Sequence, residues 1–156
     1  MRGRFVLGAI LALVVGCGPG AYTPPPPPTE AAALAYLDEV VRLVQSGGVE
    51  SICSLGSGTC PHELRAMDPA AVPALPPRVV GTRVLAPKRN PDGTWAIGGR
   101  VISLCGVDGR GKPYSSEMLV FSDGNRLIST NTLYWIGSGV ATGDTTGSPM
   151  PQARCR

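Results

Sequence analysis

The sequence predicts an α+β fold in which N-terminal helices pack on a four-stranded, curved antiparallel meander. Two patterns predict this fold: apolar residues recur at helical spacing between residues 33 and 44, and three Asp-Gly pairs separate four strand-like segments after residue 78. The 156 residues include 21 glycines and 16 prolines, whereas charged residues make up only 16%. Because so low a charge density is unusual in a disordered chain, we expect a compact domain with many turns.

The first 17 residues have the pattern of an export signal. Arg2 and Arg4 precede an uncharged segment, residues 5–15, which is shorter than the ~20 residues that span a membrane. The segment ends in Val14-Val15-Gly16-Cys17, which resembles the lipobox of bacterial lipoproteins. The resemblance implies that residues 1–16 are a cleaved signal peptide and that Cys17 is acylated.

Acylation of Cys17 implies both a partner and a location. The partner is the lipid bilayer, because two or three acyl chains such as palmitate anchor a protein stably. We expect an exported protein, attached either to an outer membrane facing the periplasm or to the outer face of the cell membrane. The alternative, an ordinary secretory signal with Cys17 in a disulfide, leaves an odd number of cysteines in an exported protein.

Residues 17–28 form the lipidated cysteine and a proline-rich tether. This segment ends in five consecutive prolines, which favour the extended polyproline II conformation. As a semi-rigid spacer it could hold a domain up to ~34 Å from the bilayer. A ligand for a proline-recognition domain is the alternative, although no basic residue flanks the prolines.

The domain itself is expected over residues 29–136 and begins with helices. Thr29 is a suitable N-cap, and apolar residues at helical spacing predict a helix over residues 30–46, which Gly47 ends. Two shorter helices are predicted over residues 49–55 and 61–67, before a proline-rich loop.

Strands follow this loop. The sequence predicts them over residues 78–86, 94–105, 114–121 and 126–136. The pairs Asp92-Gly93, Asp108-Gly109 and Asp123-Gly124 separate these segments, and Asp-Gly supplies the positive φ that tight hairpin turns need. The strands are therefore expected to form an antiparallel meander, which the first helix covers. Residues 137–156 lose all periodicity and are expected to form an irregular tail.

Four cysteines remain once Cys17 is acylated, an even number in an oxidising compartment. Three pairings are possible, and we favour Cys53 with Cys60 and Cys105 with Cys155. The cysteines lack the close Cys pairs of a zinc site, and the chain has a single histidine, His62. We therefore expect neither a metal nor another cofactor.

The order of elements over about residues 29–136 resembles the cystatin-like architecture, in particular the nuclear-transport-factor-2-like superfamily. Residues 92–97, Asp-Gly-Thr-Trp-Ala-Ile, match a hairpin motif of that superfamily, which usually precedes the final strand. At the final hairpin this chain has Asp123-Gly124 without the tryptophan. The resemblance implies a conical pocket between helix and sheet, in which the family's enzymes place an acid or a histidine.

Glu117 is the only carboxylate in the predicted strands and hence the candidate acid or base. Residue alternation does not decide which way it points; an inward, desolvated Glu117 could be a base, and an outward one is a surface residue. Four aromatic residues, Trp95, Tyr114, Tyr134 and Trp135, could line a pocket or simply pack.

The sequence favours a non-catalytic domain that binds an envelope protein or a small apolar ligand, with no catalytic residue. The alternative is a pocket enzyme, such as an isomerase or cyclase, that uses Glu117. The net charge of only +3 does not indicate a nucleic-acid partner.

Overall fold

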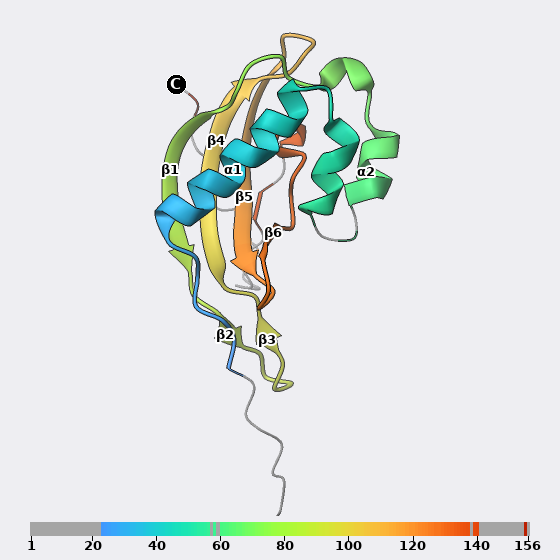
Figure 1. Ribbon diagram of the computed structural model, residues 1–156. Helices are drawn as coiled ribbons and strands as arrows, with labels where there is room; N and C mark the ends of the chain where they lie inside the picture. The colour runs from blue at the N-terminus through green and yellow to red at the C-terminus, as the bar shows by residue number, and fades with distance from the viewer. Residues whose placement is uncertain (1–22, 57, 59, 138, 141–154, 156) are drawn as a thin grey trace, which may run out of the picture.

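The computed structural model describes residues 23–56, 58, 60–137, 139–140 and 155. Within these ranges the architecture is α+β: helices lie on one face of a four-stranded antiparallel sheet, whose strand order is β1-β4-β5-β6. Figure 1 shows the long N-terminal helix crossing the concave face of the curved sheet. The predicted α+β class and the predicted four-stranded antiparallel sheet are therefore confirmed. The predictions for residues 1–22, which include Cys17, lie outside the described residues.

Helix α1, Glu30–Gln45, agrees closely with the helix predicted from the sequence. The Thr29 side chain accepts a hydrogen bond from the Ala32 N–H at 3.2 Å, and Gly47 has a φ of 78° just past the helix end. One face of the helix is buried, and its buried residues are Ala33, Tyr36, Leu37, Val40, Val41 and Val44.

Three short helical segments connect α1 to the sheet. They are the 3-10 helix η1, Val49–Ser54, the α-helix α2, Cys60–Ala66, and the 3-10 helix η2, Pro69–Ala71. The first two lie at the positions of the two predicted short helices. Asp68 caps η2 because its side chain accepts a hydrogen bond from the Ala70 N–H at 3.0 Å.

In the main sheet each strand pairs antiparallel with its neighbour. Its strands are β1, Arg78–Leu85, β4, Gly99–Val107, β5, Pro113–Ser122, and β6, Leu127–Ser129. A separate hairpin, formed by β2, Lys88–Arg89, and β3, Trp95–Ala96, lies between β1 and β4 along the chain. In Figure 1 this β2–β3 hairpin projects from one end of the sheet.

The second predicted strand, residues 94–105, is therefore divided into β3 and β4. Gly98 lies against Pro87, since a Cβ built on Gly98 would come within 2.5 Å of the Pro87 ring nitrogen. Proline has no N–H to donate to a ladder, so pairing is interrupted between the small hairpin and the main sheet.

The last predicted strand, residues 126–136, is mostly wrong. β6 ends at Ser129, and residues Tyr134–Ile136 form the 3-10 helix η3. The chain leaves the sheet after Ser129 because hydrogen bonds to β5 other than those of a strand ladder hold it. The Asn131 side-chain amide donates to the Glu117 carbonyl at 3.2 Å, and the Ser116 hydroxyl donates to the Tyr134 carbonyl. Tyr134 and Trp135 are thereby buried in the core.

All three Asp-Gly pairs lie in turns, but only two work as predicted. Gly93 and Gly124 adopt positive φ, whereas in the β4–β5 turn it is Gly111 that does so, with a φ of 81°. That turn is longer, and the Asp108 carboxylate closes it by accepting hydrogen bonds from the N–H groups of Arg110 and Lys112.

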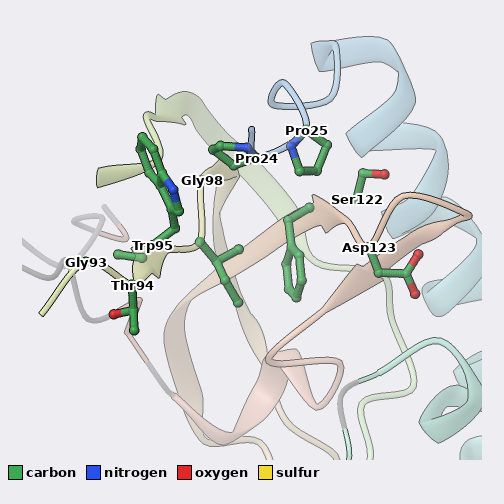
Figure 2. A pocket seen from close by; sticks show the side chains of 11 residues that line it. Pro24, Pro25, Gly93, Thr94, Trp95, Gly98, Ser122 and Asp123 are labelled. Atoms are coloured by element: carbon green, nitrogen blue, oxygen red, sulfur yellow. The ribbon is translucent and has the colours of Figure 1, made fainter. Parts of the chain in front are cut away.

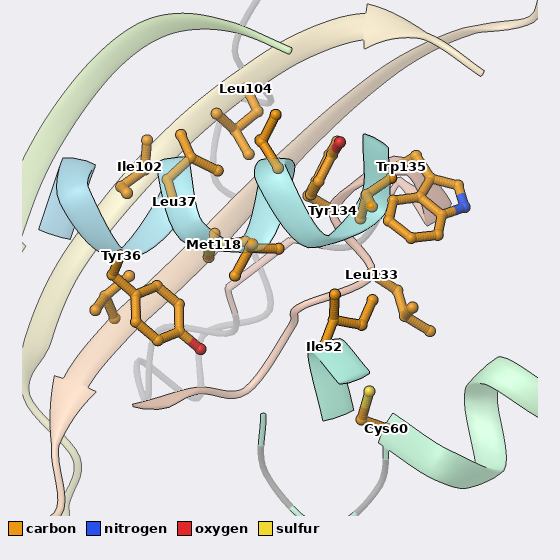
Figure 3. Packing of buried hydrophobic residues seen from close by; sticks show 14 of the residues in the cluster. Tyr36, Leu37, Ile52, Cys60, Ile102, Leu104, Met118, Leu133, Tyr134 and Trp135 are labelled. Atoms are coloured by element: carbon orange, nitrogen blue, oxygen red, sulfur yellow. The ribbon is translucent and has the colours of Figure 1, made fainter. Parts of the chain in front are cut away.

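The main core fills the space between the helices and the sheet (Figure 3). Side chains from α1, such as Leu37, meet Ile102 and Met118 from the strands, and Tyr134 adds its ring from η3. A smaller cluster of Val101, Leu119 and Phe121 lies on the other face of the sheet.

Candidate functional site

A hollow lies beside the β2–β3 hairpin, where the N-terminal segment meets the domain (Figure 2). It has a volume of about 430 Å³. Three parts of the chain line it: Pro24 and Pro25 from the N-terminal segment, Trp95 and Ile97 from the hairpin, and Phe121 from the end of β5. We call this feature the tether-end hollow.

The prolines of the hollow belong to the predicted tether. Residues 24, 25, 27 and 28 are only partly exposed, and the Pro28 carbonyl accepts a hydrogen bond from the Arg100 side chain at 3.0 Å. The sequence predicted a spacer that holds the domain away from the bilayer. The structure describes residues 23–28 of this segment, in which Pro24 and Pro25 line the hollow and Pro28 is bonded to Arg100.

The exposed part of the hollow is largely apolar. Trp95 is 38% exposed and Ile97 is 51% exposed, which are high values for residues of their size in a folded domain. The prolines and Phe121 add further apolar side chains, and Thr94, Ser122 and Asp123 supply the polar part of the lining. Such a concave apolar surface suits a hydrophobic group of a ligand or partner.

The acidic groups near the hollow are occupied by turns. The Asp123 carboxylate accepts hydrogen bonds from the N–H groups of Asn125 and Arg126, and these bonds hold its pKa below the usual range. Asp92 likewise accepts hydrogen bonds from the Thr94 hydroxyl and N–H, which lower the pKa of Asp92. Both carboxylates therefore stay ionised and fix loop conformation, which leaves the apolar side chains as the binding surface.

Glu117, the candidate acid or base, lies elsewhere. It shares a sheet face with Leu119 and Phe121, opposite the face that α1 covers, whereas its neighbour Met118 points into the main core. Glu117 is only 6% exposed, and both its carboxylate oxygens lie 3.1 Å from the Arg83 guanidinium. The Val140 N–H donates to the same carboxylate at 3.3 Å. The structure therefore places Glu117 in a buried ion pair.

The predicted aromatic candidates have different surroundings. Tyr134 and Trp135 belong to the main core, and the Trp135 indole N–H donates to the Met67 sulfur at 3.0 Å. Tyr114 is also buried. Only Trp95 is exposed, at the tether-end hollow.

Two further hollows lie near the short helices. One, of about 550 Å³, is bordered by Arg110, Lys112 and Trp135, and the other, of about 570 Å³, is bordered by Leu64 and Met67. None of the three hollows is lined by a residue of α1. The space where the resemblance implies a conical pocket is occupied by the core side chains of Figure 3.

The cysteines are paired as the sequence analysis favoured. Cys53 is bonded to Cys60, which ties η1 to α2, and Cys105 is bonded to Cys155, which ties the C-terminal region to β4. Among the described residues, no group of three or more His, Cys, Asp or Glu side chains could hold a metal ion. No helix within the described ranges has both the length and the apolar character needed to cross a bilayer.

The sequence analysis did not single out Pro24, Pro25, Ile97 or Phe121 as site residues. A usable signal existed for Ile97, because Trp95 and Ile97 are two apolar residues on the same side of a strand directly after an Asp-Gly turn. The prolines carried no such signal, since they line the same hollow as a hairpin about 70 residues further along the chain.

A scan against protein-family models, a search of curated proteins and a search of solved structures each returned no match.

Proposed function

We propose that this chain is a membrane-anchored extracytoplasmic lipoprotein of the cell envelope whose domain binds a partner and does not catalyse a reaction. One observation carries the proposal: the lipobox-like residues 14–17 lie only six residues before Thr23, where the chain meets the domain beside an open apolar hollow. The proposed acylation site thus lies six positions along the chain from Thr23, next to the two prolines that line the hollow.

The surroundings of Glu117 support binding over catalysis. A general base needs access to a substrate proton from within a cavity. Glu117 instead bonds to Arg83 and to the Val140 N–H, on the face of the sheet away from α1. The isomerase or cyclase alternative loses its candidate residue, and the apolar side chains at the tether-end hollow support the binding of an apolar group.

The cystatin-like relationship is part of this proposal. The packing of α1 across a curved antiparallel sheet supports it. Members of such architectures commonly use the space between helix and sheet, whereas here side chains occupy that space and the open apolar surface lies at the end of the sheet.

The anchor is tested by Cys17→Ala in a bacterial host that processes lipoproteins. We expect the variant to lose incorporated radiolabelled palmitate, because the acylated sulfur is gone, whereas Cys53→Ser keeps the label. An unchanged amount of label on Cys17→Ala contradicts the anchor.

Binding at the hollow is tested with an apolar fluorescent dye, anilinonaphthalene sulfonate. Replacing Trp95 and Ile97 together by Ala removes the exposed apolar walls, and we expect dye binding to fall several-fold. Leu75→Ala is the matched control, because Leu75 is 73% exposed and does not line the hollow. Equal loss in both variants would show that the dye does not select the hollow.

A further inference from the structure

We propose that the tether-end hollow and the β2–β3 hairpin rest directly on the membrane that carries the anchor, so that the partner of this surface is the phospholipid bilayer. This inference rests on the proposed lipid anchor and deepens it, since it assigns the domain an orientation on the membrane.

The first support is the combination of side chains on the hairpin. Lys88 and Arg89 form β2, and both are exposed. Trp95 in β3 and Ile97, one residue beyond the end of β3, are exposed as well. Arg89 pairs with Trp95 in the ladder. Tryptophan is enriched at the level of lipid head groups, and basic side chains bind their phosphates. The hairpin thus presents both kinds of group that a membrane surface binds.

The charges of the hairpin are available for such binding. Within the described part of the chain, neither Lys88 nor Arg89 takes part in an ion pair. The nearby acidic groups, Asp92 and Asp123, are ionised but accept hydrogen bonds within their own turns, and Asp123 pairs with Arg126 rather than with a cation of the hairpin. The two basic side chains can therefore face anionic lipids without first breaking a contact within the protein.

The second support is the length of the connection to the anchor. Six residues lead from Cys17 to Thr23, so they span at most ~20 Å in any conformation. Pro24 and Pro25 already line the hollow beside Trp95. A connection this short keeps the hairpin at a high effective concentration near the bilayer, so that even a weak affinity holds it there.

The position of the hairpin in the molecule is the third support. In Figure 1 the N-terminal segment and the β2–β3 hairpin lie at one end of the sheet, and the β4–β5 turn lies at the other end. The chain's two lysines report on these two ends, because Lys88 is in the hairpin and Lys112 is in the β4–β5 turn, and both are exposed. Contact with the membrane through the hairpin leaves Lys112 facing the aqueous phase.

The experiment uses the full acylated protein reconstituted in vesicles of phosphatidylcholine and phosphatidylglycerol, a fraction of which carry brominated acyl chains. Bromine quenches tryptophan fluorescence at short range. The chain has two tryptophans, and Trp135 is 4% exposed in the core. We expect brominated lipid to quench the wild-type protein and to have little effect on Trp95→Phe, in which only Trp135 emits.

Acetylation of the lysines gives an independent measurement on the same vesicles. We expect Lys88 to be modified several-fold more slowly than Lys112, and the difference to shrink when phosphatidylglycerol is omitted. In the variant Trp95→Asp, which keeps both lysines, the protection of Lys88 should be reduced.

The outcomes separate the two proposals. If the protein floats with the vesicles but Trp95 is not quenched and both lysines react alike, the anchor stands and the contact of the hairpin with the bilayer is refuted. If the protein does not float with the vesicles at all, the anchor is wrong and the inference falls with it.

Discussion

Glu117 and Arg83 form an ion pair on the face of the sheet away from α1. Glu117 is almost fully buried, whereas the Arg83 side chain is 32% exposed. A buried carboxylate without its cation keeps the cost of leaving water and loses the compensating bonds. The ion pair with Arg83 thus compensates the Glu117 carboxylate for the hydration that it loses on burial.

Arg83→Ala should therefore lower the free energy of unfolding by about 1–3 kcal/mol. Arg65→Ala, at an exposed position of α2, is the control and should cost little. Equilibrium unfolding in guanidinium chloride measures both. If Arg83→Ala in a Glu117→Gln background costs as much as in the wild type, the ion pair does not account for the loss.

Two buried tyrosines have hydroxyl groups that lack a hydrogen-bond partner among the described residues, namely Tyr114 and Tyr134. Burial raises the pKa of Tyr114 to about 12. Burial, together with the nearby Tyr114, also raises the pKa of Tyr134. Tyr36 differs, because its buried hydroxyl donates to the Leu55 carbonyl.

Tyr114→Phe removes an unpartnered polar atom, so we expect unchanged stability or a gain of up to ~1 kcal/mol. Tyr36→Phe instead leaves the Leu55 carbonyl without its donor and should cost ~1 kcal/mol. Unfolding curves at neutral pH distinguish the two variants. A loss in Tyr114→Phe as large as that in Tyr36→Phe would contradict the assignment.

The raised tyrosine pKa values predict a loss of stability in alkali. The folded pKa of Tyr114, about 12, lies above the ordinary value of 10.0, so the folded state holds the phenol proton more tightly than the unfolded state. This contribution is complete below pH 10.0 and is lost as the pH rises from 10.0 to about 12. Unfolding curves across this range should show the decline, with a smaller slope in Tyr114→Phe.

At the scale of elements, the β4–β5 turn is held against η2 by close backbone contact. The Gly109 N–H donates to the Ala71 carbonyl at 3.1 Å, and a Cβ at position 109 would collide with the carbonyl oxygens of Ala70 and Val72. This contact holds the β4–β5 turn, at one end of the main sheet, against η2.

Gly109→Ala should cost about 1–3 kcal/mol, because the colliding atoms are backbone and cannot rotate away. Gly81→Ala is the matched control: a Cβ at Gly81 meets no atom within 4 Å. Thermal unfolding of the two variants checks the difference, and equal midpoints would contradict the close contact.

Local signals predicted most of the elements, and long-range contacts account for the failures. α1 has both a periodic face and a cap at Thr29, and its bounds were predicted almost to the residue. The break between β3 and β4 depends on Pro87 lying against Gly98, and the loss of the last strand depends on Asn131 bonding to the Glu117 backbone. Both contacts join residues at least 11 positions apart, so no local pattern reveals them.

The candidate site was predicted only in part for the same reason. The sequence predicted that Trp95 could line a pocket or simply pack. Which of the two holds depends on where the hairpin lies relative to the sheet, and the structure leaves Trp95 exposed. Alternation along β5 could not orient Glu117, because both faces of that strand are covered and carry apolar residues.

At the scale of the whole molecule, the disulfide between Cys105 and Cys155 closes a loop across 50 residues of sequence separation. Loop-closure entropy gives such a bond ~4 kcal/mol, against ~2.5 kcal/mol for Cys53 with Cys60. Replacing both Cys105 and Cys155 by Ala should therefore reduce stability more than replacing both Cys53 and Cys60. Unfolding measured with and without reductant checks this: the variants and the wild type should converge when all bonds are reduced.

The positions of the two disulfides also set an order of assembly for a chain that emerges N-terminus first. Cys53 and Cys60 can join soon after η1 and α2 are synthesised, whereas the core partners of Leu37 in β4 and β5, Ile102 and Met118, follow 65 and 81 positions after it. Cys105 must wait for residue 155. During this interval α1 has no sheet to cover its apolar face, and the bond between Cys105 and Cys155 can form only after all four strands of the main sheet have been synthesised.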